Sequence, residues 1–123
     1  PVLIRPDGLP EDVPLYPELS GDRLDVRQTL PDDFELVGLP ADTNRADFIY
    51  ATGHTLASAT RLTGYYQRNA IEQGWKPDDA PAPKANYSTV SFRKGNRRLI
   101  IRMSPAAETS QTLVEIAVGP NAR

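Results

Sequence analysis

The chain has 123 residues, no cysteine and a formal net charge of −2, with 39% apolar and 24% charged residues. This composition fits one folded domain and excludes disulfides, a thiol nucleophile and cysteine-ligated zinc. An acidic balance also argues against non-specific nucleic-acid binding, and no apolar run reaches the roughly 18 residues of a membrane-spanning helix.

The first segment, residues 1–20, is predicted to be an extended arm because prolines recur through it. Proline lacks a backbone N–H and pushes the preceding residue towards extended geometry. The chain starts at Pro1 without an initiator Met, so we expect a processed or trimmed product, and a preceding signal peptide or lipid-bearing segment is a hypothesis. The arm docks either onto its own domain or onto a partner chain through its apolar residues, which are Val2, Leu3, Ile4, Val13, Leu15 and Tyr16.

Two strands are predicted before the only long helical pattern. Residues 23–30 alternate polar and apolar side chains, which is typical of a half-buried strand. Residues 34–39 form a short apolar stretch that we interpret as an irregular edge segment, and residues 40–44 have the composition of a loop. A second strand is expected over residues 46–52, with Phe48 and Tyr50 on one face and a stop at Gly53.

An amphipathic helix is predicted from about Thr55 to Gln73. Thr55 is a plausible N-cap, apolar residues then recur every three or four positions, and Gly74 is a natural stop. Gly64 within this helix costs about 1 kcal/mol relative to Ala, and we expect it to allow close packing on the sheet.

Residues 76–84 read as a loop, and three strands follow at 87–93, 98–103 and 113–118, the first two joined by a hairpin at residues 94–97. The predicted fold class is α+β: one long helix on a mainly antiparallel sheet, in the order strand, strand, helix, strand, strand, strand, with the last three strands paired in sequence. The expected organisation is an arm (1–20), one domain (21–119) and a tail (120–123). The expected core comprises Phe48, Tyr50, Leu56, Leu62, Tyr66, Val90, Phe92, Leu99, Ile101, Val114, Ile116 and Val118.

The sequence shows no catalytic or metal-binding constellation. The single histidine, His54, has no signature of a nucleophile or an orienting carboxylate, and a locally bonded or solvated role is expected for it. The carboxylates at 32, 33 and 35 and at 78 and 79 lack the spacing of a calcium loop and are interpreted as solvated loop charge. The scattered glycines form no phosphate-binding loop. We therefore predict a protein that is not an enzyme and uses no cofactor or metal.

One local charge anomaly is a basic hairpin. Five Lys and Arg residues fall within residues 93–102 of a net-acidic chain, and strand alternation places Arg93, Arg98 and Arg102 on the face opposite Phe92, Leu99 and Ile101. This face is either a solvated outer sheet surface or a surface that attracts phosphate head groups or an acidic partner. Nucleic acid is not expected as the partner, because Tyr87 alone is placed for base stacking.

Three short motifs resemble a group of small bacterial envelope lipoproteins and exported domains of unknown function. They are Pro14-Leu15-Tyr16-Pro17 in the arm, Tyr65-Tyr66 with Gly74-Trp75 in the helix, and Phe92-Arg93-Lys94-Gly95 with Leu99-Ile100-Ile101 in the hairpin. The resemblance covers residues 14–118, except the stretch 30–39, and implies structural roles for the tyrosines and the tryptophan.

The resemblance implies a bacterial periplasmic or outer-envelope location. The expected function is a non-catalytic, protein-binding accessory subunit of a membrane-associated assembly, with membrane association through a removed or lipidated N-terminus. The alternative is a small-ligand or lipid-binding module with a cleft between helix and sheet. The predicted partner-binding residues are Val2, Leu3, Ile4, Arg93, Arg98 and Arg102.

Overall fold

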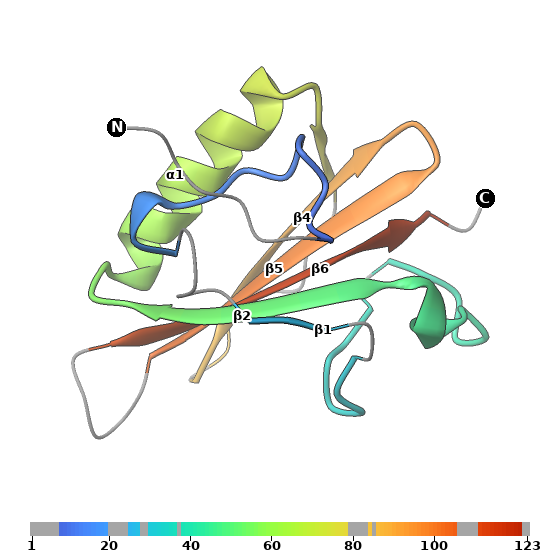
Figure 1. Ribbon diagram of the computed structural model, residues 1–123, viewed down its shortest axis with the longest axis horizontal. Helices are drawn as coiled ribbons and strands as arrows, with labels where there is room; N and C mark the ends of the chain where they lie inside the picture. The colour runs from blue at the N-terminus through green and yellow to red at the C-terminus, as the bar shows by residue number, and fades with distance from the viewer. Residues whose placement is uncertain are drawn as a thin grey trace.

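The computed structural model describes residues 8–19, 25–27, 30–36, 38–78, 84, 86–105 and 111–121. In these residues the chain is an α+β fold in which one α-helix, α1 (Ala59–Glu72), packs on a six-stranded antiparallel sheet (Figure 1). The sheet order is β1-β2-β6-β5-β4-β3, so the last three strands pair in sequence, as predicted. The strands are β1 (Asp25–Arg27), β2 (Ile49–Thr55), β3 (Lys76–Asp78), β4 (Ser88–Lys94), β5 (Arg97–Pro105) and β6 (Thr112–Pro120).

The junction between β2 and α1 lies later in the chain than predicted. Gly53 does not end the strand, because β2 continues through it and pairs with β6 as far as Thr55 opposite Thr112. The predicted N-cap at Thr55 is therefore wrong. Ser58 caps α1 instead, and its side chain accepts a hydrogen bond from the backbone N–H of Arg61 at 3.1 Å.

Two stretches have different secondary structure from the prediction. Residues 46 and 47, expected to begin a strand, lie in a short 3₁₀ helix, η3 (Arg45–Asp47), capped by the side chain of Asn44. The predicted loop after the helix begins with β3, which pairs with the β4 residues 91–93. The described part of the arm is not wholly extended either, because it contains a 3₁₀ turn, η1 (Pro17–Leu19).

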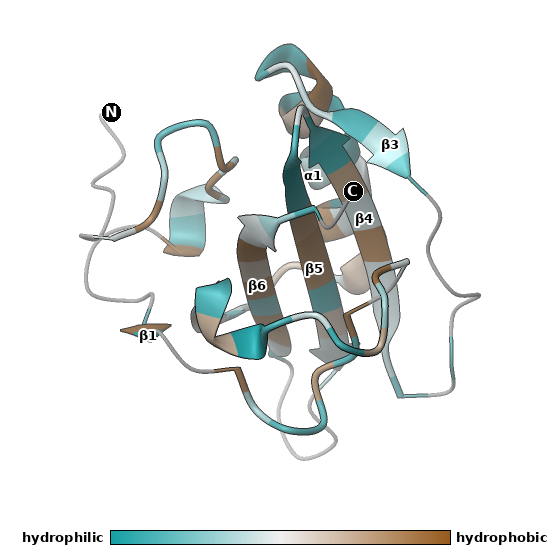
Figure 2. Cartoon of the chain, turned by 90° about the vertical axis from the view of Figure 1, so that its right-hand side faces the viewer, coloured by the Kyte–Doolittle hydropathy of each residue, from teal (hydrophilic) through white to brown (hydrophobic). Residues whose placement is uncertain are grey.

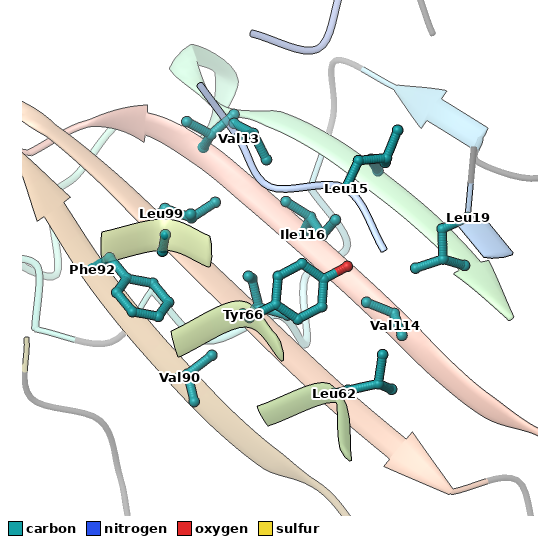
Figure 3. Close-up of a cluster of buried hydrophobic side chains, with 14 of the residues drawn as sticks. Val13, Leu15, Leu19, Leu62, Tyr66, Val90, Phe92, Leu99, Val114 and Ile116 are labelled. Carbon is teal, nitrogen blue, oxygen red and sulfur yellow. The ribbon is translucent and has the colours of Figure 1, made fainter. Parts of the chain in front are cut away.

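One face of the sheet is covered jointly by α1 and the arm. Figure 3 shows Val13, Leu15 and Leu19 of the arm on the same side of the sheet as Leu62 and Tyr66 of α1, and all five are at most 2% exposed. They share one apolar cluster with helix-facing residues of β4, β5 and β6. The described arm is therefore part of the core of its own domain, which is the first of the two predicted alternatives.

The opposite face of the sheet is covered as well, by residues 30–36 and 38–48. Figure 2 looks onto this side, where the segment crosses in front of the strands and α1 lies behind them. Leu30, Phe34 and Phe48 are buried there against Ile100 and other residues of a second cluster. The predicted edge segment at 34–39 thus covers a sheet face, although its backbone is irregular, as expected.

Eleven of the twelve predicted core residues are buried, and Leu56 is wrong because it is 67% exposed in the turn before α1. Phe48 and Tyr50 belong to the second cluster and not to the helix-facing core. The helix-facing residues of β2 are Ile49 and Ala51. Strand alternation separated the two sets correctly but could not tell which face carried the helix.

Candidate functional site

Asp12 fastens the arm to the β4–β5 hairpin. Its carboxylate accepts hydrogen bonds from Lys94 Nζ at 2.9 Å and from both terminal nitrogens of Arg97 at 2.6 and 3.0 Å. The Arg97 guanidinium stacks on the Trp75 ring at 5.0 Å, and Trp75 Nε1 donates to the backbone oxygen of Asp12 at 2.7 Å. These hydrogen bonds, with that of Arg97 foremost, lower the pKa of Asp12 to about 2.

The rest of the described arm is held by α1 and β2. Tyr65 donates its hydroxyl hydrogen bond to the backbone oxygen of Leu15 at 2.7 Å, and Thr55 donates one to the Glu18 carboxylate. The Tyr66 hydroxyl is buried without a hydrogen-bond partner and lies against the backbone of Tyr16. Burial raises the pKa of Tyr66, because the ionised form would be desolvated.

A cavity of about 260 Å³ opens beside Asp12, where the arm, the hairpin and the ends of β2 and β6 meet. Val118 is buried and Ile49 half-buried, so they form its apolar floor, while Pro120 and Asn96 are exposed at its rim. We call this place the arm–hairpin junction, and its lining residues are Pro10, Asp47, Ile49, Asn96, Arg97, Val118, Gly119 and Pro120.

Arg102, one of the predicted partner-binding residues, lies in a buried network on the second sheet face. Its guanidinium forms a two-point ion pair with Glu115 at 2.7 and 2.8 Å, and only 12% of the side chain is exposed. Tyr50 donates its hydroxyl hydrogen bond to the same carboxylate. The ion pair raises the pKa of Arg102, and burial is the main cause that raises the pKa of Tyr50. The Arg102 guanidinium also lies over the rings of Phe34 and Tyr87, at 4.9 and 5.4 Å from their centroids.

Arg98 is engaged within the chain too, whereas Arg93 is the most open of the three predicted arginines. The Arg98 side chain is 6% exposed, bonds Ser91 and Asn121, and forms an ion pair with Asp78 at 3.3 Å. Arg93 is 53% exposed and lies 3.9 Å from the same Asp78 carboxylate. The prediction of a solvated face is thus wrong for Arg98 and Arg102. The predicted apolar contacts at Val2, Leu3 and Ile4 lie outside the described residues.

A second, larger hollow lies between α1 and β4, with a volume of about 450 Å³. Val90 at its base is buried, Thr63 is half-buried, and Thr60 and Gln67 are exposed along its helix side. Among the residues that the structure describes, no charged side chain lines it. We call it the α1–β4 groove, and its lining residues are Ala59, Thr60, Thr63, Gln67, Ser88, Thr89 and Val90.

The other residues that could carry chemistry lie apart. His54 is exposed on β2, beside a hollow that Glu18 also lines. Asp32, Asp33 and Glu35 are exposed in the covering segment, as expected of solvated loop charge, whereas Asp78 pairs with arginine, and Asp79 is not described. Among the residues that can be placed, no three acidic or histidine side chains gather in a way that could hold a metal ion. No described helix is long and apolar enough to cross a membrane.

Comparison with known protein families finds no matching family model, and comparison with characterised proteins and with solved structures finds no similar chain.

Proposed function

We propose that this chain is a non-catalytic, protein-binding domain of the bacterial cell envelope, an accessory subunit whose partner docks at the arm–hairpin junction. The observation that carries the proposal is the cavity of about 260 Å³ at this junction. It has an apolar floor and lies beside two cations that share one carboxylate, Lys94 and Arg97 on Asp12.

The size of this cavity favours one side chain of a protein over a whole small molecule. Pockets for drug-sized ligands occupy roughly 300–1,000 Å³, which is more than this cavity offers. Protein interfaces, in contrast, concentrate their binding energy in a few anchor residues that fill well-packed pockets. An apolar anchor of the partner would cover Val118 and Ile49 and be ringed by the polar groups of Asn96 and Arg97.

The charged groups beside the cavity would favour a partner that carries both acidic and basic groups around its anchor. Lys94 and Arg97 carry two positive charges, and about a third of each side chain is exposed. Two carboxylates balance them, Asp12 and the exposed Asp47 of the cavity lining. Arg93 adds no charge at the cavity, because it lies beside the Asp78 carboxylate and alternates with Lys94 onto the opposite face of the sheet. Such partly exposed charges mainly raise the association rate, and their effect falls as salt is added.

The envelope assignment rests on the motif resemblance. Three of those motif residues contact the arm, and this supports the proposal. Tyr65 of the helix motif bonds Leu15 of the arm motif, Trp75 bonds Asp12, and Lys94 of the hairpin motif bonds the same Asp12. We accordingly propose that the motifs specify a preassembled arm–hairpin junction. The periplasmic or outer-envelope location and the membrane association belong to this proposal.

Site-specific photo-crosslinking tests the docking site. A photoreactive amino acid replaces Pro120 at the cavity rim, and in a matched control it replaces Gln67, which is also exposed but lies on the α1–β4 groove. Both proteins are irradiated with the envelope fraction of the source cells. We expect one adduct from position 120 that is absent from position 67. An excess of unlabelled parent protein should suppress this adduct by competition, whereas an excess of the cavity-blocking variant Pro120→Trp should not.

Two results would contradict the proposal. One is an adduct that forms equally from both positions. The other is an adduct from position 120 that parent and Pro120→Trp suppress alike, because such a contact would not need the cavity.

A further inference from the structure

We infer that the α1–β4 groove is a binding site for a free, uncharged small molecule with an aliphatic body and an amide or hydroxyl head. This site is separate from the arm–hairpin junction, because the two share no lining residue. The inference does not depend on the proposed protein partner, and the two can be tested apart.

The volume of the groove suits a small ligand. At about 450 Å³ it falls within the range of roughly 300–1,000 Å³ that is typical of small-molecule sites, unlike the cavity at the arm–hairpin junction. Its base is Val90, which is buried in the main core cluster, so a ligand would rest on a firm apolar floor. One side is the first half of α1 and the other is the beginning of β4.

The polar groups of the groove are all neutral. They are the hydroxyls of Thr60, Thr63, Ser88 and Thr89 and the amide of Gln67. Thr63 donates only to the sulfur of Met103 at 3.6 Å, and sulfur is a weak acceptor. Its hydroxyl can therefore turn towards a ligand at little cost.

The neutral character of the described lining indicates the class of ligand. A charged group that enters the groove would lose water without meeting a counter-ion, and such desolvation is costly. An amide or hydroxyl head would exchange its water for hydrogen bonds with the threonine and serine hydroxyls and the glutamine amide. An aliphatic body would meanwhile cover Val90 and Ala59.

Three eight-carbon probes that differ only in the head group test this inference: octanamide, octanoate and octylammonium. Binding is followed by the amide chemical shifts of the ¹⁵N-labelled full chain below the micellar concentration of each probe. We expect shifts centred on the backbone of Thr63, Gln67 and Val90. We also expect octanamide to bind about tenfold more tightly than either ion.

A matched pair of variants separates this site from general stickiness. Gln67→Trp fills the rim of the groove, whereas Arg68→Trp places the same ring on the next helix position, outside the lining, and both residues are exposed. We expect at least a tenfold loss of octanamide affinity for Gln67→Trp and less than a twofold change for Arg68→Trp.

Four results would overturn the inference. They are equal binding of the three probes, equal effects of the two variants, no octanamide binding at its solubility limit, and flotation of the protein with zwitterionic lipid vesicles that Gln67→Trp abolishes. The last result would assign the groove to a membrane and not to a free ligand. None of them bears on crosslinking from position 120, so failure here leaves the protein-docking proposal standing.

Discussion

At the scale of single residues, Asp12 has the most consequence, because one carboxylate joins the arm to the hairpin. Its pKa is lowered from 3.8 to about 2, so the folded state prefers the ionised form more strongly than the unfolded chain does. The stability that this preference contributes is complete above the unfolded pKa and is lost as the pH falls from about 4 towards 2.

Replacing this carboxylate gives the first prediction. Asp12→Asn should destabilise the protein by about 1 kcal/mol at pH 7, a value that allows for solvent screening of a partly exposed pair. The difference from the parent should shrink as the pH falls from 4 to 2. Urea unfolding of both proteins across this range measures it, and a difference that stays constant with pH would show that the Asp12 charge does not hold the arm.

Tyr66 gives a second prediction at this scale, because its hydroxyl is fully buried and unpartnered. A buried polar group without a hydrogen bond costs about 1–3 kcal/mol. Tyr66→Phe removes the group and keeps the ring that packs between α1 and the arm, so we expect a gain of about 1 kcal/mol in the free energy of unfolding. A loss of stability in denaturant titration would mean that the hydroxyl has a partner in solution.

At the scale of elements, the sheet is covered on both faces, by α1 with the arm on one and by residues 30–36 and 38–48 on the other. Alternation of polar and apolar residues predicted strands, because this pattern is present wherever one face of the sheet is more polar than the other. The segment that covers the second sheet face was not predicted, although two runs of consecutive apolar residues indicated that this face is buried. They are Leu99-Ile100-Ile101 and Ile116-Ala117-Val118. Consecutive apolar residues in a strand indicate burial on both sides.

Two glycines, one in a crowded position and one in an open position, together test how the helix and the strands pack. In β6, a Cβ at Gly119 would lie 2.6 Å from the buried Phe48 ring, whereas a Cβ at Gly64 of α1 would meet nothing within 4 Å. The expected role of Gly64 in close packing on the sheet is therefore wrong. Gly119→Ala should cost about 1–3 kcal/mol through overpacking, and Gly64→Ala should stabilise the helix by up to about 1 kcal/mol. Thermal unfolding of the pair checks both, and equal shifts would contradict the packing described.

At the scale of the whole molecule, the sequence could predict the α+β class but only part of the candidate site. The cluster of Arg and Lys residues indicated the hairpin, and the apolar residues of the arm indicated docking. The contact that joins arm and hairpin depends on Asp12, and the sequence around Asp12 does not predict that contact. Arg98 and Arg102 looked exposed because charged strand residues usually face water. They are covered by described residues of the second face, Gly38 beside Arg98 and Phe34 beside Arg102. Only the three-dimensional register brings Glu115 opposite Arg102.

We propose that a protein partner is anchored in the cavity of the arm–hairpin junction. The most direct test of this claim is the dissociation rate of the protein crosslinked from position 120, measured by surface plasmon resonance on the parent, Pro120→Trp and Gln67→Trp. Loss of a buried anchor acts mainly on dissociation. We predict that Pro120→Trp speeds dissociation at least tenfold, about 1.4 kcal/mol, and that Gln67→Trp leaves the rate unchanged. An unchanged rate for Pro120→Trp together with faster dissociation for Gln67→Trp would contradict the claim and place the partner in the α1–β4 groove.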